Sequence, residues 1–139
     1  MNNKHCKLAI SHESGDEGFE YVEWIKEHAY DHGVDVRIAE MYIASPWNNN
    51  GDRQKKYSLW SVYPHTDFIT FSSLTEGFGN AFLEAVYFKK PILINRYDTY
   101  VRDIEPKGFD LVAIDGFLNK KAVQNVRELL KSPMRRKEW

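Results

Sequence analysis

The chain has little cysteine, little net charge and no long hydrophobic run. Its one cysteine, Cys6, has no partner for an internal disulfide, so we expect a reducing, cytoplasmic setting. Cys6 begins an apolar segment, which predicts a small core residue. The formal net charge of -1 gives no electrostatic reason to expect nucleic acid or an anionic membrane as a partner. No apolar run has the length of a signal peptide or a membrane helix, so we expect a soluble protein.

Several ligand-binding patterns are also missing. The histidines have no metal-ligand spacing and there is no cysteine cluster, so we expect no structural zinc. The segment Gly15-Asp16-Glu17-Gly18 lacks the Gly-x-Gly-x-x-Gly spacing, which argues against a nicotinamide- or flavin-binding module. Ser72 and Ser73 do not form a nucleophile elbow. We therefore expect no cofactor.

What the sequence does contain is a regular alternation of short apolar runs and helical patterns, which is typical of a parallel α/β sheet. The expected strands are Lys7 to Ser11, Val34 to Ile38, Asp67 to Ser72, Pro91 to Asn95 and Leu111 to Ile114. The expected helices run from the capping-box pair Ser14 and Glu17 to His32-Gly33, from Gln54 to Tyr63 before Pro64, from Phe82 to Phe88, and from Lys120 to Lys131. Residues expected to face inward are Phe19, Val22, Ile25 and Ala29 in the first helix and Val123, Val126, Leu129 and Leu130 in the last.

These elements predict one α/β fold, a Rossmann-like parallel sheet flanked by helices. Right-handed crossovers bring the carboxyl ends of all strands to one edge, where ligands bind. Four loops should meet at that edge: residues 11–16, 39–41, 72–80 and 95–100.

The most informative segment is the junction between the third strand and its helix. Gly77 and Gly79 let the backbone come close to a ligand, and the helix N-terminus favours a phosphate. Glu76 and Glu84 flank this turn, and carboxylates accept hydrogen bonds from hydroxyl groups. Glu84 could instead only complement the helix dipole, and the glycines could only shape the turn. The two acids together favour a site that holds the hydroxyls at both ends of a nucleotide sugar.

Glu76 and Glu84 are eight positions apart and match the E-x7-E motif of GT-B glycosyltransferases. The segment HTDFITFSSLTEGFGNAFLEAVYFKKPILIN resembles the corresponding run of the large GT4-type family. This resemblance implies one half of a GT-B fold, an NDP-sugar donor and transfer that retains the anomeric configuration. Such transfer is usually explained without a clear protein nucleophile.

The resemblance also implies roles for particular residues. Glu76, the one residue assigned to catalysis, would position hydroxyls of the donor sugar, and Glu84 would bind the ribose hydroxyls. The loop from Ala39 to Met41 would flank the base. The full set of expected nucleotide-sugar-binding residues is Gly77, Phe78, Gly79, Asn80, Glu84, Glu40, Met41, His12 and Arg96. Arg96 could equally pair with Asp98 or Asp103.

The chain departs from the family in two respects. It has room for one Rossmann-like half, and the Arg and Lys that follow the first strand of the family's C-terminal half have no counterpart. We therefore expect residues 1–139 to be a single, incomplete C-terminal domain that starts at its second strand. The N-terminal, acceptor-binding half would be missing, and the isolated chain should have little or no transferase activity.

Two other functions would use a similar site. One is a non-catalytic module that only binds a nucleotide or a nucleotide sugar. The other is a GT-B-type sugar-nucleotide epimerase, which would act on the donor without an acceptor. Tight nucleotide binding without turnover would indicate the first, and epimerisation or hydrolysis without an acceptor would indicate the second.

Overall fold

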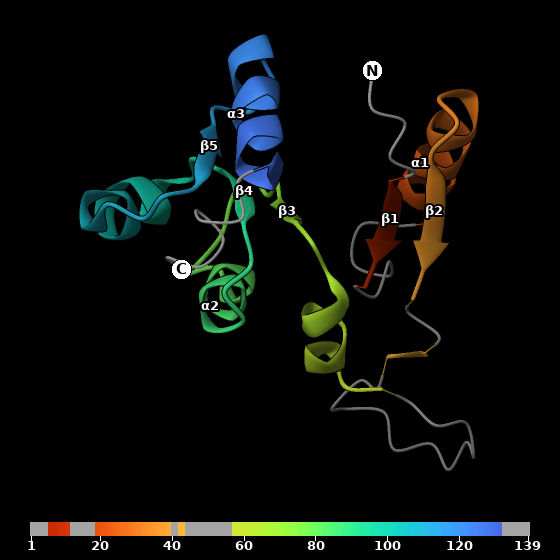
Figure 1. Cartoon of the computed structure of the whole chain (residues 1–139), viewed down its shortest axis with the longest axis horizontal. Helices are drawn as coiled ribbons and strands as arrows, with labels where there is room; N and C mark the ends of the chain where they lie inside the picture. The colour runs from red at the N-terminus through yellow and green to blue at the C-terminus, as the bar shows by residue number, and fades with distance from the viewer. Residues whose placement is uncertain (1–5, 12–18, 40–41, 44–56, 132–139) are drawn as a thin grey trace. The chain divides into compact units, whose positions relative to one another are not determined.

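The computed structural model describes residues 6–11, 19–39, 42–43 and 57–131 (Figure 1). The chain divides into two compact units, Met1–Ser61 and Val62–Trp139. The capping-box residues Ser14 and Glu17 lie outside the described residues.

The first unit contains a helix between two parallel strands. Strand β1 (Lys7–Ile10) pairs along its whole length with β2 (Asp35–Ile38). Helix α1 (Phe19–Asp31) connects them and buries Val22, with Ile25 and Ala29 half-buried on the same face. The helix ends as predicted, because Gly33 adopts a left-handed conformation with φ +65°.

The second unit is built on a three-stranded parallel sheet with the order β3-β4-β5. Its strands are β3 (Ile69–Phe71), β4 (Ile92–Asn95) and β5 (Val112–Ile114). Helix α2 (Asn80–Tyr87) connects β3 to β4, and α3 (Lys120–Lys131) follows β5. All four residues of β4 are buried, as expected for a central strand covered on both faces.

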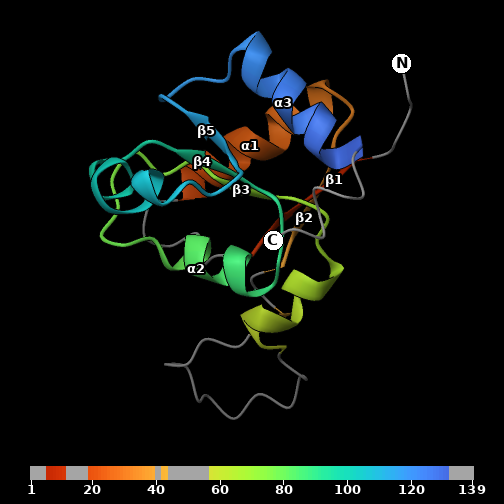
Figure 2. The ribbon, with the colours of Figure 1, turned by 60° about the vertical axis from the view of Figure 1, so that its left-hand side comes forward.

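Successive residues of β4 pack on opposite faces of this sheet, because strand side chains alternate in direction. Ile94 contacts Phe82 of α2 on one face, and Leu93 packs with Ala122 and Leu129 of α3 on the other. Figure 2 shows α2 and α3 on the two sides of the strands. The unit therefore has a three-layer arrangement whose centre is β4.

The connection from β4 to β5 is helical, although no helix was predicted between these strands. It contains a π-helical segment, Tyr100–Ile104, followed by a short 3-10 segment, Glu105–Lys107. Tyr100 and Ile104 are buried against the α2 side of the sheet. Pairs of large side chains at this spacing mark a buried helical face even in a short segment.

The structure confirms the α/β fold class, with parallel strands flanked by helices, and it confirms Lys120–Lys131 as the last helix. The described strands pair in a two-stranded and a three-stranded sheet. No helix in the described part of the chain is both long and apolar enough to cross a membrane.

Three local predictions are wrong. In the described part of the expected helix from Gln54 to Tyr63, the structure has short 3-10 segments at Leu59–Ser61 and Tyr63–His65. Pro64 lies inside the second segment. Proline has no N–H donor, and it fits the start of a helical turn because the first N–H groups there have no acceptor within the turn. Cys6 is exposed, like the first residues of the adjoining strand. Val123 is also exposed, because Ala122 and Leu129 define the buried face of α3.

Truncating the buried face of α3 should destabilise the second unit. Leu129 is 2% exposed, so Leu129→Ala should lower the free energy of unfolding by about 2–5 kcal/mol through lost burial and a residual cavity. Denaturant unfolding followed by far-UV circular dichroism measures this change. Val123→Ala is the matched control in the same helix, since this side chain is 38% exposed, and it should cost much less. Equal losses for the two variants would contradict this account of the core.

Candidate functional site

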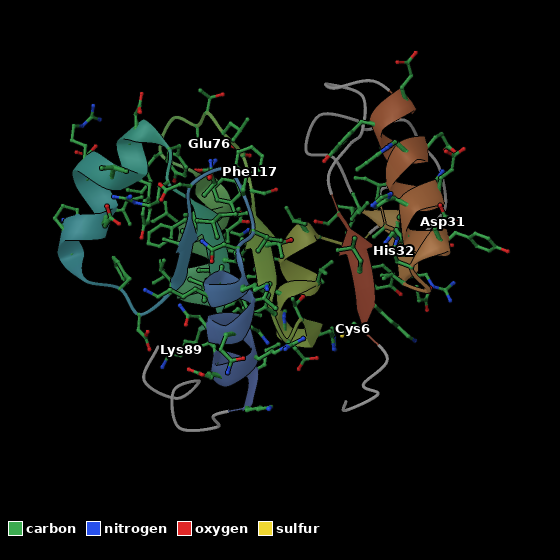
Figure 3. All side chains as sticks on the ribbon, turned by 90° about the horizontal axis from the view of Figure 1, so that it is seen from above. Cys6, Asp31, His32, Glu76, Lys89 and Phe117 are labelled. Atoms are coloured by element: carbon green, nitrogen blue, oxygen red, sulfur yellow. The ribbon has the colours of Figure 1, made fainter. Side chains whose placement is uncertain are left out.

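The predicted glycine turn lies at the carboxyl end of β3 and leads directly into α2. Figure 3 shows Glu76, which follows β3, and Phe117, which follows β5, at one end of the second unit, with Lys89 at the other end. This arrangement follows from the parallel pairing of the strands, which places their carboxyl ends on one edge. The turn therefore occupies the edge of the sheet where ligands of α/β proteins bind.

Gly79 is the residue on which the geometry of this turn depends. It is the N-cap of α2, it is buried, and its φ of +86° is a left-handed conformation that side chains disfavour. A Cβ atom at this position would lie 2.4 Å from the hydroxyl oxygen of Tyr97. By contrast, a Cβ atom at Gly77 would meet no atom within 4 Å. A side chain would therefore fit at position 77 but not at position 79.

Tyr97 contacts the turn from the buried core between the sheet and α2. Its ring is 2% exposed and packs edge-on against Phe71. Its hydroxyl donates a hydrogen bond to the carbonyl oxygen of Phe78 at 2.9 Å. Burial raises the pKa of this phenol, and the negative charge of Glu76 raises it further. Tyr97 therefore stays protonated, and remains a hydrogen-bond donor, at neutral pH.

The N-terminus of α2 presents backbone donors at this edge. The first N–H groups of a helix have no acceptor within the helix. Phe82 donates to the carbonyl of Gly79 at 3.0 Å, which closes the first turn. Within the described residues, no hydrogen bond engages the amides of Gly79 and Asn80. These two groups can donate to an anion or a hydroxyl.

The two glutamates of the motif precede and follow the turn in the sequence, and their surroundings differ. Glu76 is exposed, whereas Glu84 is half-buried in α2. A carboxylate oxygen of Glu84 accepts a hydrogen bond from the hydroxyl of Tyr63, whose ring stacks on Phe88 with centroids 5.0 Å apart.

The surroundings of Tyr63, including its contact with Glu84, raise the pKa of its phenol. Burial raises its pKa well above the ordinary value, and the hydrogen bond to Glu84 and the charge of that carboxylate raise it further. The proton of Tyr63 is therefore held firmly, and the phenol fixes the direction of the Glu84 side chain. Nothing in the local sequence pattern of Tyr63 indicates its partner, which is 21 residues away.

Asn95 connects the loops that follow β3 and β5. It is the last residue of β4, and it is 4% exposed. Its amide nitrogen donates to the carbonyl of Ser73 at 3.1 Å, and its side-chain oxygen accepts from the backbone N–H of Gly116 at 2.6 Å. Both polar atoms of a buried side chain are thus paired, as burial requires. A polar residue that ends a fully apolar strand is a signal that the sequence did offer.

Arg96 pairs with acids other than those expected. Its guanidinium group contacts Glu105 at 2.8 Å and Asp115 at 3.2 Å, and these interactions raise its pKa. The alternative in which Arg96 pairs with Asp98 or Asp103 is not the arrangement in the structure, where Asp103 pairs with Arg102. To bind a diphosphate, Arg96 would have to leave its ion pairs with Glu105 and Asp115.

The remaining expected site residues, His12, Glu40 and Met41, lie outside the described residues. Among the expected residues that the structure describes, residues 76–80 lead into the start of α2, and Glu84 lies within this helix. Over the part of the chain that the structure describes, no group of three or more His, Cys, Asp or Glu side chains could hold a metal ion.

Comparison with known proteins shows two similar sequences, both named mannosylglucosylglycerate synthase, which are glycosyltransferases. The protein of Petrotoga mobilis is 39% identical over 95 residues, which cover 68% of this chain and 21% of that protein. The protein of Thermotoga maritima is 31% identical over 127 residues, which cover 82% of this chain and 28% of that protein. The chain thus matches about a quarter of the length of these relatives. No family model matches the chain, and no solved structure matches it significantly.

A side chain at position 79 should disrupt the turn. Gly79→Ala forces a left-handed alanine and places its Cβ atom against the Tyr97 hydroxyl, so we expect a loss of about 1–3 kcal/mol in the free energy of unfolding. Gly77→Ala is the matched control, because that position has open space and no positive φ. Thermal unfolding of the two variants tests this, and a Gly79→Ala variant as stable as Gly77→Ala would refute the assignment.

The raised pKa of Tyr63 predicts alkaline destabilisation. Below the ordinary tyrosine pKa of about 10, the phenol is protonated in the folded and the unfolded chain, and its contribution to stability is complete. Above that pH the unfolded chain loses the proton first, so the free energy of unfolding should fall as the pH rises toward the folded pKa.

Denaturant unfolding at a series of alkaline pH values measures this slope. Tyr63→Phe should make the slope shallower, because the phenylalanine ring keeps the stacking on Phe88 but carries no ionisable proton. Tyr87→Phe is the control, since Tyr87 is 71% exposed. An unchanged slope in Tyr63→Phe would show that Tyr63 does not contribute to it.

Proposed function

We propose that this chain is the nucleotide-sugar-binding part of a GT-B, GT4-type glycosyltransferase that takes an NDP-sugar as its donor. The observation that carries the proposal is the position of Gly79. This residue caps α2 in a left-handed conformation at the carboxyl edge of the sheet, between Glu76 and Glu84. The names of the two relatives support a sugar-transfer function, and the E-x7-E spacing supports the family.

The proposed binding mode uses the charge distribution around the turn. The diphosphate lies against the amides of Gly79 and Asn80, where the partial positive charge at the start of α2 favours an anion. Glu84 accepts hydrogen bonds from the ribose hydroxyls, in a direction that Tyr63 fixes. Glu76 accepts hydrogen bonds from hydroxyls of the donor sugar on the other side of the turn. Each carboxylate thus binds neutral hydroxyls while the amides bind the negative charge.

In the proposed reaction, the bond between the anomeric carbon and the diphosphate oxygen breaks, and a bond to an acceptor hydroxyl oxygen forms on the same face of the sugar. The nucleoside diphosphate leaves with the electron pair, and its departing oxygen takes the proton that the acceptor hydroxyl loses. Glu76 acts by positioning the sugar, and the amides at the start of α2 stabilise the charge that develops on the leaving diphosphate.

The relatives' name suggests the substrate class. A mannosylglucosylglycerate synthase forms a product that contains mannose, glucose and glycerate units, so we propose a mannosyl donor and a glucosylglycerate-type acceptor for the protein to which this chain corresponds. Because the matches span 21% and 28% of these relatives, the residues that bind the acceptor would belong to the remainder of such a protein.

The proposal predicts a specific loss of affinity in Glu84→Gln. This change replaces the charged carboxylate, which accepts hydrogen bonds from the ribose hydroxyls, with a neutral amide. The amide oxygen can still accept the hydrogen bond from Tyr63. We expect the binding of a nucleoside diphosphate to weaken by roughly 1.5–3 kcal/mol, as measured by isothermal titration calorimetry.

Glu128→Gln is the matched control, because it makes the same chemical change on the exposed surface of α3 and should leave the affinity unaltered. Equal affinity of Glu84→Gln and the unaltered chain would refute the role of Glu84. Epimerisation or hydrolysis of an NDP-sugar without an acceptor would replace the transferase proposal with an epimerase.

A further inference from the structure

We propose that Tyr97 is a positioning residue that aims the backbone N–H of Gly79 at the donor diphosphate. The hydroxyl of Tyr97 would do so by holding the carbonyl of the Phe78–Gly79 peptide group. The inference rests on the proposed function, since it explains how one backbone N–H group of that site is oriented. No sequence pattern indicates a role for Tyr97.

The orientation follows from peptide geometry. The carbonyl oxygen of Phe78 accepts a hydrogen bond from the Tyr97 hydroxyl at 2.9 Å, so this oxygen points toward the interior of the unit. The carbonyl of Phe78 and the N–H of Gly79 belong to one planar peptide group, and no described residue has a cis peptide bond. In a trans peptide these two groups point in opposite directions. The N–H of Gly79 is therefore directed away from Tyr97 and toward the outer side of the turn.

The hydroxyl of Tyr97 also lies close to the Cα atom of Gly79, on the side where a side chain would be. The hydroxyl oxygen is 2.4 Å from the place where a Cβ atom of residue 79 would be. A tyrosine hydroxyl at position 97 and a residue without a side chain at position 79 thus fit together. The left-handed φ of Gly79 then leads the chain into α2 directly after the oriented peptide.

The ring of Tyr97 is held from several directions, so its hydroxyl has a fixed position. The ring packs edge-on against Phe71 and at a tilt against Tyr100, with centroids 6.0 Å apart in each pair. Its backbone N–H donates to the carbonyl of Asn95 at 3.0 Å. Since Asn95 also binds the loops after β3 and β5, the position of Tyr97 is tied to the same edge of the sheet.

The test compares two tyrosine-to-phenylalanine changes. Tyr97→Phe removes the one hydroxyl that holds the Phe78 carbonyl and keeps the ring contacts. Tyr100→Phe is the matched control, because Tyr100 is equally buried and adjoins Tyr97 but makes no hydrogen bond to the turn within the described residues. Calorimetry with a nucleoside diphosphate should show affinity weakened about 2- to 10-fold in Tyr97→Phe, the range that one hydrogen bond gives, and unaltered affinity in Tyr100→Phe.

A second measurement separates positioning from a general loss of stability. In amide nuclear magnetic resonance spectra, the Gly79 signal of the unaltered chain should shift when the nucleoside diphosphate binds. In Tyr97→Phe this shift should become smaller, while the amide signals of α3 stay where they are. Destabilisation of the whole unit would instead change the signals of α3 together with that of Gly79.

The outcomes distinguish the two proposals. If the unaltered chain binds no nucleoside diphosphate, the proposed function fails and this inference fails with it. If the unaltered chain binds and Tyr97→Phe binds equally well, with the same Gly79 shift, the proposed function stands and the role of Tyr97 is refuted. Weaker binding with a smaller Gly79 shift, in a variant whose α3 signals are unchanged, supports both.

Discussion

The burial of β4 on both faces is the constraint from which the second unit follows. A strand that packs α2 through Ile94 and α3 through Leu93 must be apolar along its length and must lie between two parallel neighbours. Its carboxyl end then falls between the ends of β3 and β5. Asn95, placed at that end, is buried, and both polar atoms of its side chain bind the two adjacent loops. The packing of the core and the geometry of the site edge thus have the same origin.

The turn above this edge combines negative side chains with positive backbone groups. In the proposed binding mode, Glu76 and Glu84 accept hydrogen bonds from neutral hydroxyls, and the backbone amides bind the negatively charged diphosphate. Tyr63 holds the inner carboxylate in place, and Tyr97 holds the peptide group between the two acids. Two buried phenols, both with raised pKa values, therefore hold polar groups of the candidate site.

Prediction from the sequence succeeded where a local pattern and its tertiary setting agree. The strands around residues 69–71, 92–95 and 112–114 and the helix at 120–131 are continuous apolar or periodic segments with clear boundaries. Prediction failed where a partner was needed to decide. The segment around Tyr63 has the composition of a helix, but Pro64 and the bond from Tyr63 to Glu84 favour short 3-10 turns. Arg96 had several acids nearby in sequence, and the folded chain brings it to Glu105, nine residues away, and to Asp115, 19 residues away.

The sequence by itself determined the α/β class, the strand-to-helix junction at the glycine pair, and the two acids that flank it, because these depend on side-chain periodicity and on spacing along the chain. Only the tertiary structure decided that Gly79, and not Gly77, must be glycine, and that Tyr63, Asn95 and Tyr97 support the site. The physical reason is that each of these requirements is a contact between residues far apart in sequence. A hydrogen bond across the sheet edge has no local signature, since it exists only once the strands have paired.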